Sequence, residues 1–287
     1  MADVSFSKSV VGEAAVTEAA AAEEAIVASS RRWRPARERW LGIATIIAFI
    51  VVWEIVYRLG LMPTWAFPSP WKVVLAFQEL IANGKLLTNT AASVGRQITG
   101  VFFAALIGIP AGLALGASPT ARAAFLPLCR LLYPIPGIAW IPLAILWFGV
   151  GFTSTVFVIF FSGIWSIMFN TMTGVQTLSG QYTDVAKVYL ASRGLYTRRI
   201  LIPGSLPYII TGMRLTYGVG WRVIVGAEMI SSITGLGFLI DDARWQLRPD
   251  IMICGMITIA MIGWVSENWF FDWVEEKTIV RWGMRTA

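Results

Sequence analysis

The sequence predicts an all-α membrane protein with six transmembrane helices. Of its 287 residues, 56% are hydrophobic and only 14% are charged, whereas a soluble domain is usually about 25% charged. The apolar residues are gathered into long runs, and about 20 such residues in a helix suffice to cross the hydrocarbon core of a bilayer. The 14 Trp and 16 Phe residues fit the aromatic belts that form at membrane surfaces. We therefore expect most of the chain to contact membrane lipid.

Six apolar stretches have the length of a span, and the third is interrupted by Arg130 and several prolines. They cover residues 41–57, 98–115, 124–150, 152–175, 206–230 and 251–273. The segment before the second span is longer than a turn, and residues 71–82 within it are expected to form a surface helix. The predicted parts of the chain are a cytoplasmic N-terminal tail (1–38), the first span (39–60), a periplasmic segment (61–87), a transmembrane domain (88–274) and a cytoplasmic C-terminal tail (275–287).

The positions of the basic residues predict that both chain ends lie in the cytoplasm. Positive residues are enriched in the cytoplasmic loops of membrane proteins. Nucleic-acid binding is the alternative for the first group, but the positive-inside rule explains it better, and the Ala- and Glu-rich start does not resemble a signal peptide. The basic groups precede the first span (Arg31, Arg32, Arg34, Arg37, Arg39), lie between spans four and five (Lys187, Arg193, Arg198, Arg199) and follow the last span (Arg281, Arg285).

Small residues recur every four positions along the second span. They form a groove down one helix face, and such grooves let a neighbouring helix approach closely in lipid. The neighbour is either another helix of the same chain or a second subunit, and the pattern alone does not separate the two. The residues are Gly100, Ala104, Gly108, Gly112 and Gly116.

Spans three and five contain the candidates for a translocation pathway. Prolines remove backbone hydrogen bonds and kink helices, and broken backbone at membrane depth is tolerated only when it is buried in protein or lines a wet cavity. Charges within spans are costly and usually functional. A static kink and a solvated arginine are the alternatives. The pathway candidates are Pro134, Pro136, Ala139, Trp140, Pro142, Arg222 and Glu228.

The composition argues against catalysis by this chain. It has no histidine, which removes the commonest general base and metal ligand. Cys129 and Cys254 lie inside apolar runs, so neither a disulfide nor a metal site is expected. An intramembrane enzyme would also need a Gly-x-Ser-x-Gly motif or paired intramembrane aspartates, and neither occurs. The phosphate-loop motif Gly-x-x-x-x-Gly-Lys-[Ser/Thr] is absent, because Gly84-Lys85 is followed by Leu86.

The loop between spans four and five, residues 177–205, is much longer than a connection requires. Within it, Asp184-Val185-Ala186 is followed at a fixed distance by Ile200-Leu201-Ile202-Pro203. This spacing resembles the "EAA" loop of binding-protein-dependent ABC importer permeases, in which Glu-Ala-Ala precedes a glycine and then Ile-x-Leu-Pro. Leu190 stands where that family has glycine.

Other segments resemble the nitrate/sulfonate/taurine subgroup of these permeases, in order along residues 41–282. They are Ser93-Val94-Gly95-Arg96 with Gly100, Pro136 with Ala139-Trp140-Ile141-Pro142-Leu143, Leu146-Trp147-Phe148-Gly149, Gly220-Trp221-Arg222, Ala227-Glu228, Gly235-Leu236-Gly237 and Arg281-Trp282.

The resemblance implies a six-span permease with the type I ABC importer fold in the cell inner membrane. It implies a homodimer around a central pathway, an ATP-binding subunit that carries ATP-Mg on the cytoplasmic face, and a periplasmic solute-binding protein that delivers a small anion such as a sulfonate, taurine or nitrate. This chain itself would bind no cofactor and no nucleic acid. A six-span secondary transporter or channel not powered by ATP is the alternative.

The loop is expected to couple this chain to the ATPase. We expect a short helix near residues 184–190 to enter a cleft of the ATPase, with Ala186 at the contact and the loop arginines on carboxylates at its rim. The residues assigned to coupling are Asp184, Val185, Ala186, Lys187, Leu190, Arg193, Arg198, Arg199, Ile202 and Pro203.

Overall fold

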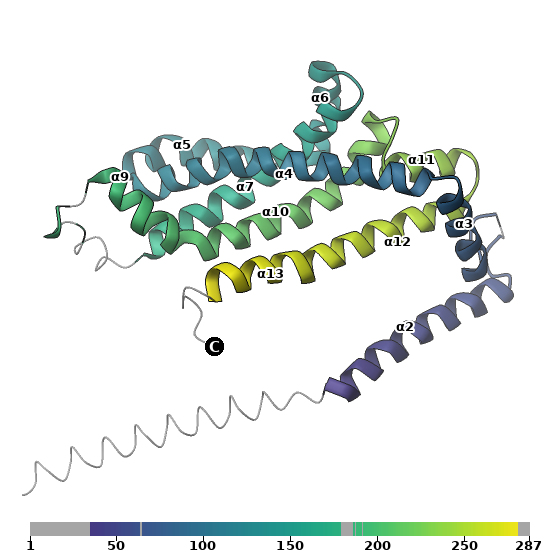
Figure 1. Ribbon diagram of the computed structural model, residues 1–287. Coiled ribbons are helices and arrows are strands. Elements are labelled where there is room, and N and C mark those ends of the chain that lie inside the picture. The colour runs from purple at the N-terminus through teal and green to yellow at the C-terminus, as the bar shows by residue number, and fades with distance from the viewer. Residues whose placement is uncertain (1–34, 64, 179–185, 187, 191, 281–287) are drawn as a thin grey trace, which may run out of the picture. The chain divides into compact units, whose positions relative to one another are not determined.

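The computed structural model describes residues 35–63, 65–178, 186, 188–190 and 192–280 of the chain (Figure 1). Every regular element in these ranges is a helix, and they contain no strand. The chain separates into two units, Met1–Leu61 and Met62–Ala287. The predicted all-helical fold is confirmed.

The described part of the first unit is dominated by α2 (Pro35–Arg58), which consists mostly of apolar residues. Its 24 residues extend about 36 Å at the 1.5 Å rise of an α-helix, enough to cross the hydrocarbon core. Near its end, Arg58 donates a hydrogen bond of 2.6 Å to Glu54, so this carboxylate is paired within its own helix. The predicted first span, residues 41–57, lies inside α2.

Within the described ranges, four helices are each long and apolar enough to cross a membrane. The number rises to six if each of two bent helix pairs is one span, and the predicted count of six corresponds to this second count. In the second unit the long helices are α4 (Lys85–Ala117), α7 (Phe152–Thr177), α10 (Ile202–Ser231) and α12 (Pro249–Val265), which continues through α13 (Phe271–Glu275) to Val280.

Helix α4 begins well before the predicted start near residue 98. Its first turns contain the polar residues Asn89, Ser93, Arg96 and Gln97. A prediction based on apolar runs therefore places the start of this span too late. Three of these side chains, Ser93, Arg96 and Gln97, are buried and hydrogen-bonded inside the protein. Other residues of the chain therefore meet most of their polarity, while Arg96 Nε and Gln97 Oε1 have no hydrogen-bond partner among the described residues.

The groove of small residues on α4 is filled by α7 of the same chain. A Cβ atom at Gly112 would lie 2.5 Å from the carbonyl oxygen of Met168, and one at Gly116 would lie 2.5 Å from Cβ of Val175. Such separations leave no room for a side chain. Of the two neighbours that the sequence allowed, the structure therefore identifies intramolecular packing.

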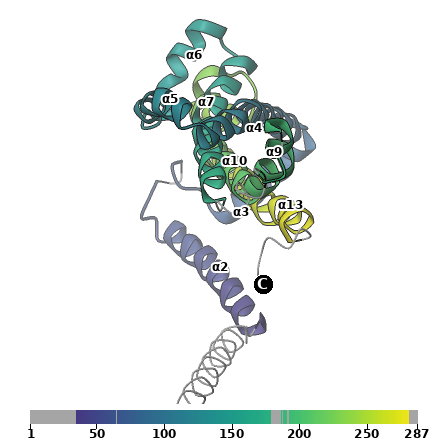
Figure 2. The same ribbon diagram turned by 90° about the vertical axis from the view of Figure 1, so that its left-hand side faces the viewer.

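Helix α10 approaches α7 equally closely on another face. Thr216 donates a hydrogen bond of 2.8 Å to the carbonyl oxygen of Gly163, and a Cβ atom at Gly212 would lie 3.0 Å from Cα of Ile167. Helices α4, α7 and α10 thus form one closely packed group, which the two views show as neighbouring helices (Figures 1 and 2).

One shorter helix packs against α4 and α12. Residues 71–82 were expected to be helical, and α3 (Pro70–Ala82) is a helix whose first turn is capped by Ser69, which accepts a hydrogen bond from the backbone N–H of Lys72. Arg248, at the start of α12, donates hydrogen bonds of 2.9 and 2.8 Å to Glu79 of α3. These bonds hold the pKa of the Glu79 carboxyl below its ordinary value.

The third predicted span is a bent pair, α5 (Pro119–Leu132) and α6 (Ile141–Phe148). The pair bends by 88° at the break formed by residues 133–136, and the 3-10 helix Gly137–Trp140 after the bend leads into α6. In both views α6 projects away from the α4–α7–α10 group (Figures 1 and 2). Its first turn is buried, since Ile141 and Ala144 pack against Val158, Val223 and Ala227. Its last turn contacts α7 through ring contacts of Trp147 and Phe148 with Phe157.

Candidate functional site

A buried ion pair joins α4 to the far end of α10. The side chains of Arg96 and Glu228 are 4% and 0% exposed, and Arg96 Nη1 lies 2.8 Å from Glu228 Oε1. Ser93 donates to both carboxylate oxygens at 2.8 Å, and the backbone N–H of Gly237 donates to Oε2 at 2.9 Å. Three donors, from Arg96, Ser93 and Gly237, therefore surround the carboxylate, and the single Ser93 proton is shared between its two oxygens. Such partners offset the cost of burying a charge.

The same groups also hold the turn that follows α10. Arg96 donates to the carbonyl oxygen of Thr234 at 2.7 Å and to its hydroxyl at 2.8 Å. The N–H of Leu236, which begins α11 (Leu236–Trp245), donates to Ser93 Oγ at 2.8 Å, and the N–H of Gly235 donates to Asn89 at 2.7 Å. We call these residues the Glu228 cluster: Asn89, Ser93, Arg96, Glu228, Thr234, Gly235, Leu236 and Gly237.

Two glycines are required for this arrangement. Gly235 has φ +116°, in a region that L side chains rarely adopt, and a Cβ atom there would collide with the Glu228 carboxylate. A Cβ atom at Gly237 would lie 2.5 Å from the carbonyl oxygen of Val225 and 2.8 Å from Cβ of Glu228. Three motifs that are far apart in the sequence, Ser93–Arg96, Ala227–Glu228 and Gly235–Gly237, thus meet at one carboxylate.

In the sequence analysis, Glu228 was assigned to the pathway. Its partner, Arg96, was not identified as a charged residue within a membrane span. The reason is the predicted start of the second span near residue 98, which left Arg96 outside it. The structure places Glu228 inside the protein, paired with Arg96, and without exposed surface. The side chain is therefore not open to a passing solute in this conformation.

The proline-rich break between α5 and α6 lies against α7 and α10. Pro134 and Pro136 lie in the non-helical bend, and Pro142 lies in the first turn of α6, where a missing N–H costs no hydrogen bond. These three prolines and Ala139 are exposed. Trp140 packs on Phe161 of α7, with ring centroids 4.3 Å apart.

Arg222 lies on α10 close to this break. A Cβ atom at Gly226, one turn further along α10, would lie 3.5 Å from Ile138 of the 3-10 helix, and one at Gly137 would lie 3.5 Å from Val223. The Arg222 side chain is exposed, and no acidic group pairs with it among the residues that the structure describes. The structure thus brings Arg222 near the break, while Glu228 lies apart in its cluster.

The loop of residues 177–205 is described only in part. Asp184, Val185 and Lys187 lie outside the described residues, and of Arg193 only the backbone is described, at the start of the short helix α9 (Arg193–Tyr196). Ala186 is helical and buried, whereas Tyr189 and Leu190 are 81% and 91% exposed. Tyr189 and Leu190 thus contribute exposed apolar surface to the described part of the loop.

Leu190 adopts the conformation that glycine would favour. Its φ is +50°, in the left-handed region where side chains other than Gly, Asn and Asp are uncommon. The turn after the short helix is therefore present without the glycine of the resembled family. The cost of this conformation is of the order of 1 kcal/mol for an L-residue.

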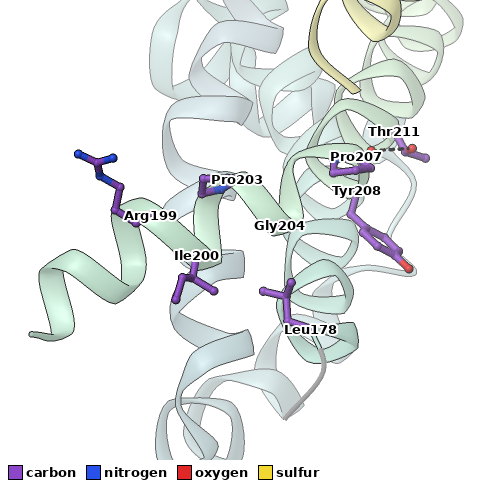
Figure 3. Close-up of a pocket in the computed structure, with 8 residues that line it drawn as sticks. All are labelled: Leu178, Arg199, Ile200, Pro203, Gly204, Pro207, Tyr208 and Thr211. Atoms are coloured by element: carbon purple, nitrogen blue, oxygen red, sulfur yellow. Dashed lines mark hydrogen bonds between the residues drawn. The ribbon is translucent and has the colours of Figure 1, made fainter. Parts of the chain in front are cut away.

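The end of the loop leads directly into α10. Arg198 and Arg199 lie on the π-helical turn Thr197–Leu201, and both are exposed; Ile202 and Pro203 begin α10. A groove of about 790 Å³ lies beside this junction. Figure 3 shows its lining, in which Leu178 from the end of α7 lies beside Gly204 of α10. The groove is lined by Leu178, Arg199, Ile200, Pro203, Gly204, Pro207, Tyr208 and Thr211.

Comparison with known proteins defines the class. Residues 104–279 match the family described as "Binding-protein-dependent transport system inner membrane component". The taurine transport system permease protein TauC of Escherichia coli (strain K12) is 34% identical over 241 residues, covering 82% of this chain and 88% of TauC. The nitrate import permease protein NrtB of Leptolyngbya laminosa is 31% identical over 255 residues, covering 83% and 91% of the two chains.

This chain belongs to the binding-protein-dependent family of transport permeases, as its loop and motifs predicted. It is a permease subunit of an ABC importer, that is, a transport component and not itself an enzyme. A chain of the MetNI methionine ABC transporter, solved in an inward-facing conformation, shares the fold with a TM-score of 0.56 at 15% identity, covering 66% of this chain and 94% of that one. The comparisons favour this class over a secondary transporter or channel.

Two glycine substitutions separate the cost of a steric collision with Glu228 from the cost of backbone strain. Gly235 and Gly151 both have positive φ, +116° and +137°, and both are nearly extended in ψ, but only Gly235 has an atom within 4 Å of a substituted Cβ. Gly151→Ala should cost only the backbone strain, of order 1–3 kcal/mol. Gly235→Ala should cost about 3 kcal/mol more, because it displaces one partner of a buried ion pair.

The measurement is the midpoint of thermal unfolding of each purified variant in detergent. Gly235→Ala should lower it clearly more than Gly151→Ala does. Equal decreases would contradict the assignment of Gly235 to the enclosure of the Glu228 carboxylate.

Proposed function

We propose that two copies of this chain form the pathway through which an ABC importer carries a small oxyanion. Its family is binding-protein dependent, which implies an ATP-binding subunit and a solute-binding protein as partners. Two relatives are named for the transport of taurine, a sulfonate, and of nitrate. ATP and Mg²⁺ would be bound by the ATPase subunit, and the second permease would be an identical copy of this chain.

The exposure of Arg222, without an acidic partner among the described residues, supports an anionic cargo. An exposed guanidinium within a membrane-spanning helix is costly unless it is paired or meets water and ligand. Arg96 is neutralised by Glu228, whereas Arg222 has no acidic partner among the described residues and lies beside the broken segment of α5 and α6. Guanidinium groups bind planar oxyanions through paired N–H donors. The exposed residues of the break, Pro134, Pro136, Ala139 and Pro142, would line the same pathway, with Trp140 behind them.

The loop of residues 177–205 is the surface on which the ATPase would bind. Its exposed apolar residues Tyr189 and Leu190 would enter a cleft of the ATPase, and Arg198 and Arg199 would meet carboxylates at the rim. Ala186 would support the short helix from its buried side. The remaining assigned residues are Asp184, Val185, Lys187 and Arg193, and Ile202 and Pro203 join the loop to α10. This assignment places the loop and both chain ends in the cytoplasm.

Ala186 is buried, so a charge there would disturb the loop itself; an exposed residue provides a cleaner test. Tyr189→Asp should leave membrane insertion unchanged and should remove the ATPase from the purified complex, because a charge would enter an apolar contact. A matched control is Trp245→Asp, which adds the same charge at another exposed aromatic residue far along the chain from the loop. The measurement is the amount of ATPase that copurifies with the tagged permease.

The control should retain the ATPase at the wild-type level. Full retention by both Tyr189→Asp and Leu190→Asp, with normal ATP hydrolysis, would contradict the assignment of this loop to the ATPase contact.

The anion assignment has a separate test in reconstituted vesicles that contain the permease, the ATPase and the binding protein. Arg222→Gln should lower the rate of taurine or nitrate uptake about tenfold, the loss expected for one charge-assisted hydrogen bond. Arg222→Lys should retain more uptake, because it keeps the charge. Arg244→Gln, which removes an exposed arginine from α11, serves as the control. Unchanged uptake by Arg222→Gln would show that this side chain does not act on the cargo.

A further inference from the structure

Helix α10 links the 177–205 loop to the Glu228 cluster without interruption. It contains 30 residues, from Ile202 to Ser231, and therefore extends about 45 Å. Its first residue directly follows the π-helical turn that carries Arg198 and Arg199. Glu228 lies in its last turn. A displacement of the loop therefore acts on one end of a helix whose other end is held by the cluster.

The middle of α10 forms the surface against which the proline-rich break packs. Val223 and Ala227 are buried in contact with Ile141 and Ala144 of α6. Gly226, which lies next to Ile138, is one turn from Arg222 on the same helix. A rotation or a sliding movement of α10 about its axis would therefore move Arg222 away from the break and loosen this contact.

The Glu228 cluster resists both of these movements. It binds the end of α10 to α4 through Ser93 and Arg96, and to the following turn through Thr234 and Gly237. Breaking a buried ion pair leaves an uncompensated charge, which is strongly unfavourable. Further along α10 towards the loop, Gln97 of α4 donates a hydrogen bond of 2.7 Å to the carbonyl oxygen of Tyr217. Helix α10 is thus tied to α4 at its end and again near its middle.

We propose that Arg96 and Glu228 are positioning residues for transport, which lock α10 to α4 so that movement of the 177–205 loop reaches the broken segment and Arg222. Neither side chain contacts the cargo. This proposal rests on the proposed function, in which the loop binds an ATPase. It goes beyond that function by assigning the transmission of movement to a cluster at the opposite end of the helix from the loop.

The test uses the complete importer in vesicles, with the permease, the ATPase and the binding protein present. Uptake of taurine or nitrate and ATP hydrolysis are measured in the same sample, and their ratio is the readout. Glu228→Gln keeps the shape of the side chain and removes its charge. Ser93→Ala is a milder change that removes one donor to both carboxylate oxygens. Arg96→Lys keeps the charge but loses the forked geometry that reaches Thr234.

A stability-matched control separates positioning from general destabilisation. Leu80→Ala removes a fully buried side chain from α3, away from α10, and should destabilise the protein by leaving a cavity. The unfolding midpoints of the control and of the cluster variants are measured alongside transport. A purely structural role would lower uptake and ATP hydrolysis together, in these variants as in the control.

We expect Glu228→Gln to lower the ratio of uptake to ATP hydrolysed about tenfold, a size typical of coupling between distant sites. Ser93→Ala should lower this ratio less. The ratio for Arg96→Lys should lie between those of Glu228→Gln and wild type, and Leu80→Ala should leave the ratio unchanged. An unchanged ratio in Glu228→Gln overturns the proposal. If Glu228→Gln does not assemble, Ser93→Ala decides in the same way. A wild-type complex without ATP-dependent uptake would instead overturn the proposed function.

Discussion

The ion pair between Arg96 and Glu228 is the constraint on which the arrangement of the second unit depends. Two charges buried away from water must satisfy each other and their remaining hydrogen-bonding capacity within the protein. Here the pair accounts for polar residues in the first turns of α4, for Gly235 and Gly237 after α10, and for the hydrogen bonds that hold the turn into α11. Of the two arginines in α10, Arg214 pairs with Asp272 and Glu275, whereas Arg222 has no acidic partner among the described residues.

Much of the fold could be predicted from the sequence because lipid imposes a simple rule. A span must be apolar and about 20 residues long, and the runs that obey this rule became α2, α7, α12 and most of α4. The rule failed where the protein itself solvates polar groups. The first turns of α4 were missed because Asn89, Ser93 and Arg96 find their partners on segments more than 130 residues further along the chain.

The candidate site shows the same division between local and tertiary information. The prolines of the break and the spacing of the loop are local features, and the sequence identified both. The partner of the α4 glycine groove and the enclosed position of Glu228 depend on tertiary contacts, which no single segment reveals. At Leu190 the sequence lacked the family glycine, yet φ is +50°. Leu190 therefore adopts a left-handed conformation in which an L-residue is strained.

The α4, α7 and α10 helices differ from the α5–α6 pair in how firmly they are held. The first three are joined by glycine contacts, by the Glu228 cluster and by the hydrogen bond from Thr216 to Gly163. Helix α6 is held by its buried first turn and by ring contacts to Phe157 of α7, and it exposes large apolar residues such as Leu146. Because a closely packed group moves as a body, we expect conformational change in this permease to occur mainly between the three packed helices and α6.

Distances between spin labels in the assembled importer test this account most directly, with and without bound ATP. One pair joins Leu87 of α4 to Ile230 of α10, and the other joins Leu146 of α6 to Ile230; all three positions are exposed. If the Glu228 cluster locks α4 to α10, the Leu87–Ile230 distance stays constant when ATP binds, while the Leu146–Ile230 distance changes. A change in the first distance would contradict this account, because α4 and α10 would then not be locked together.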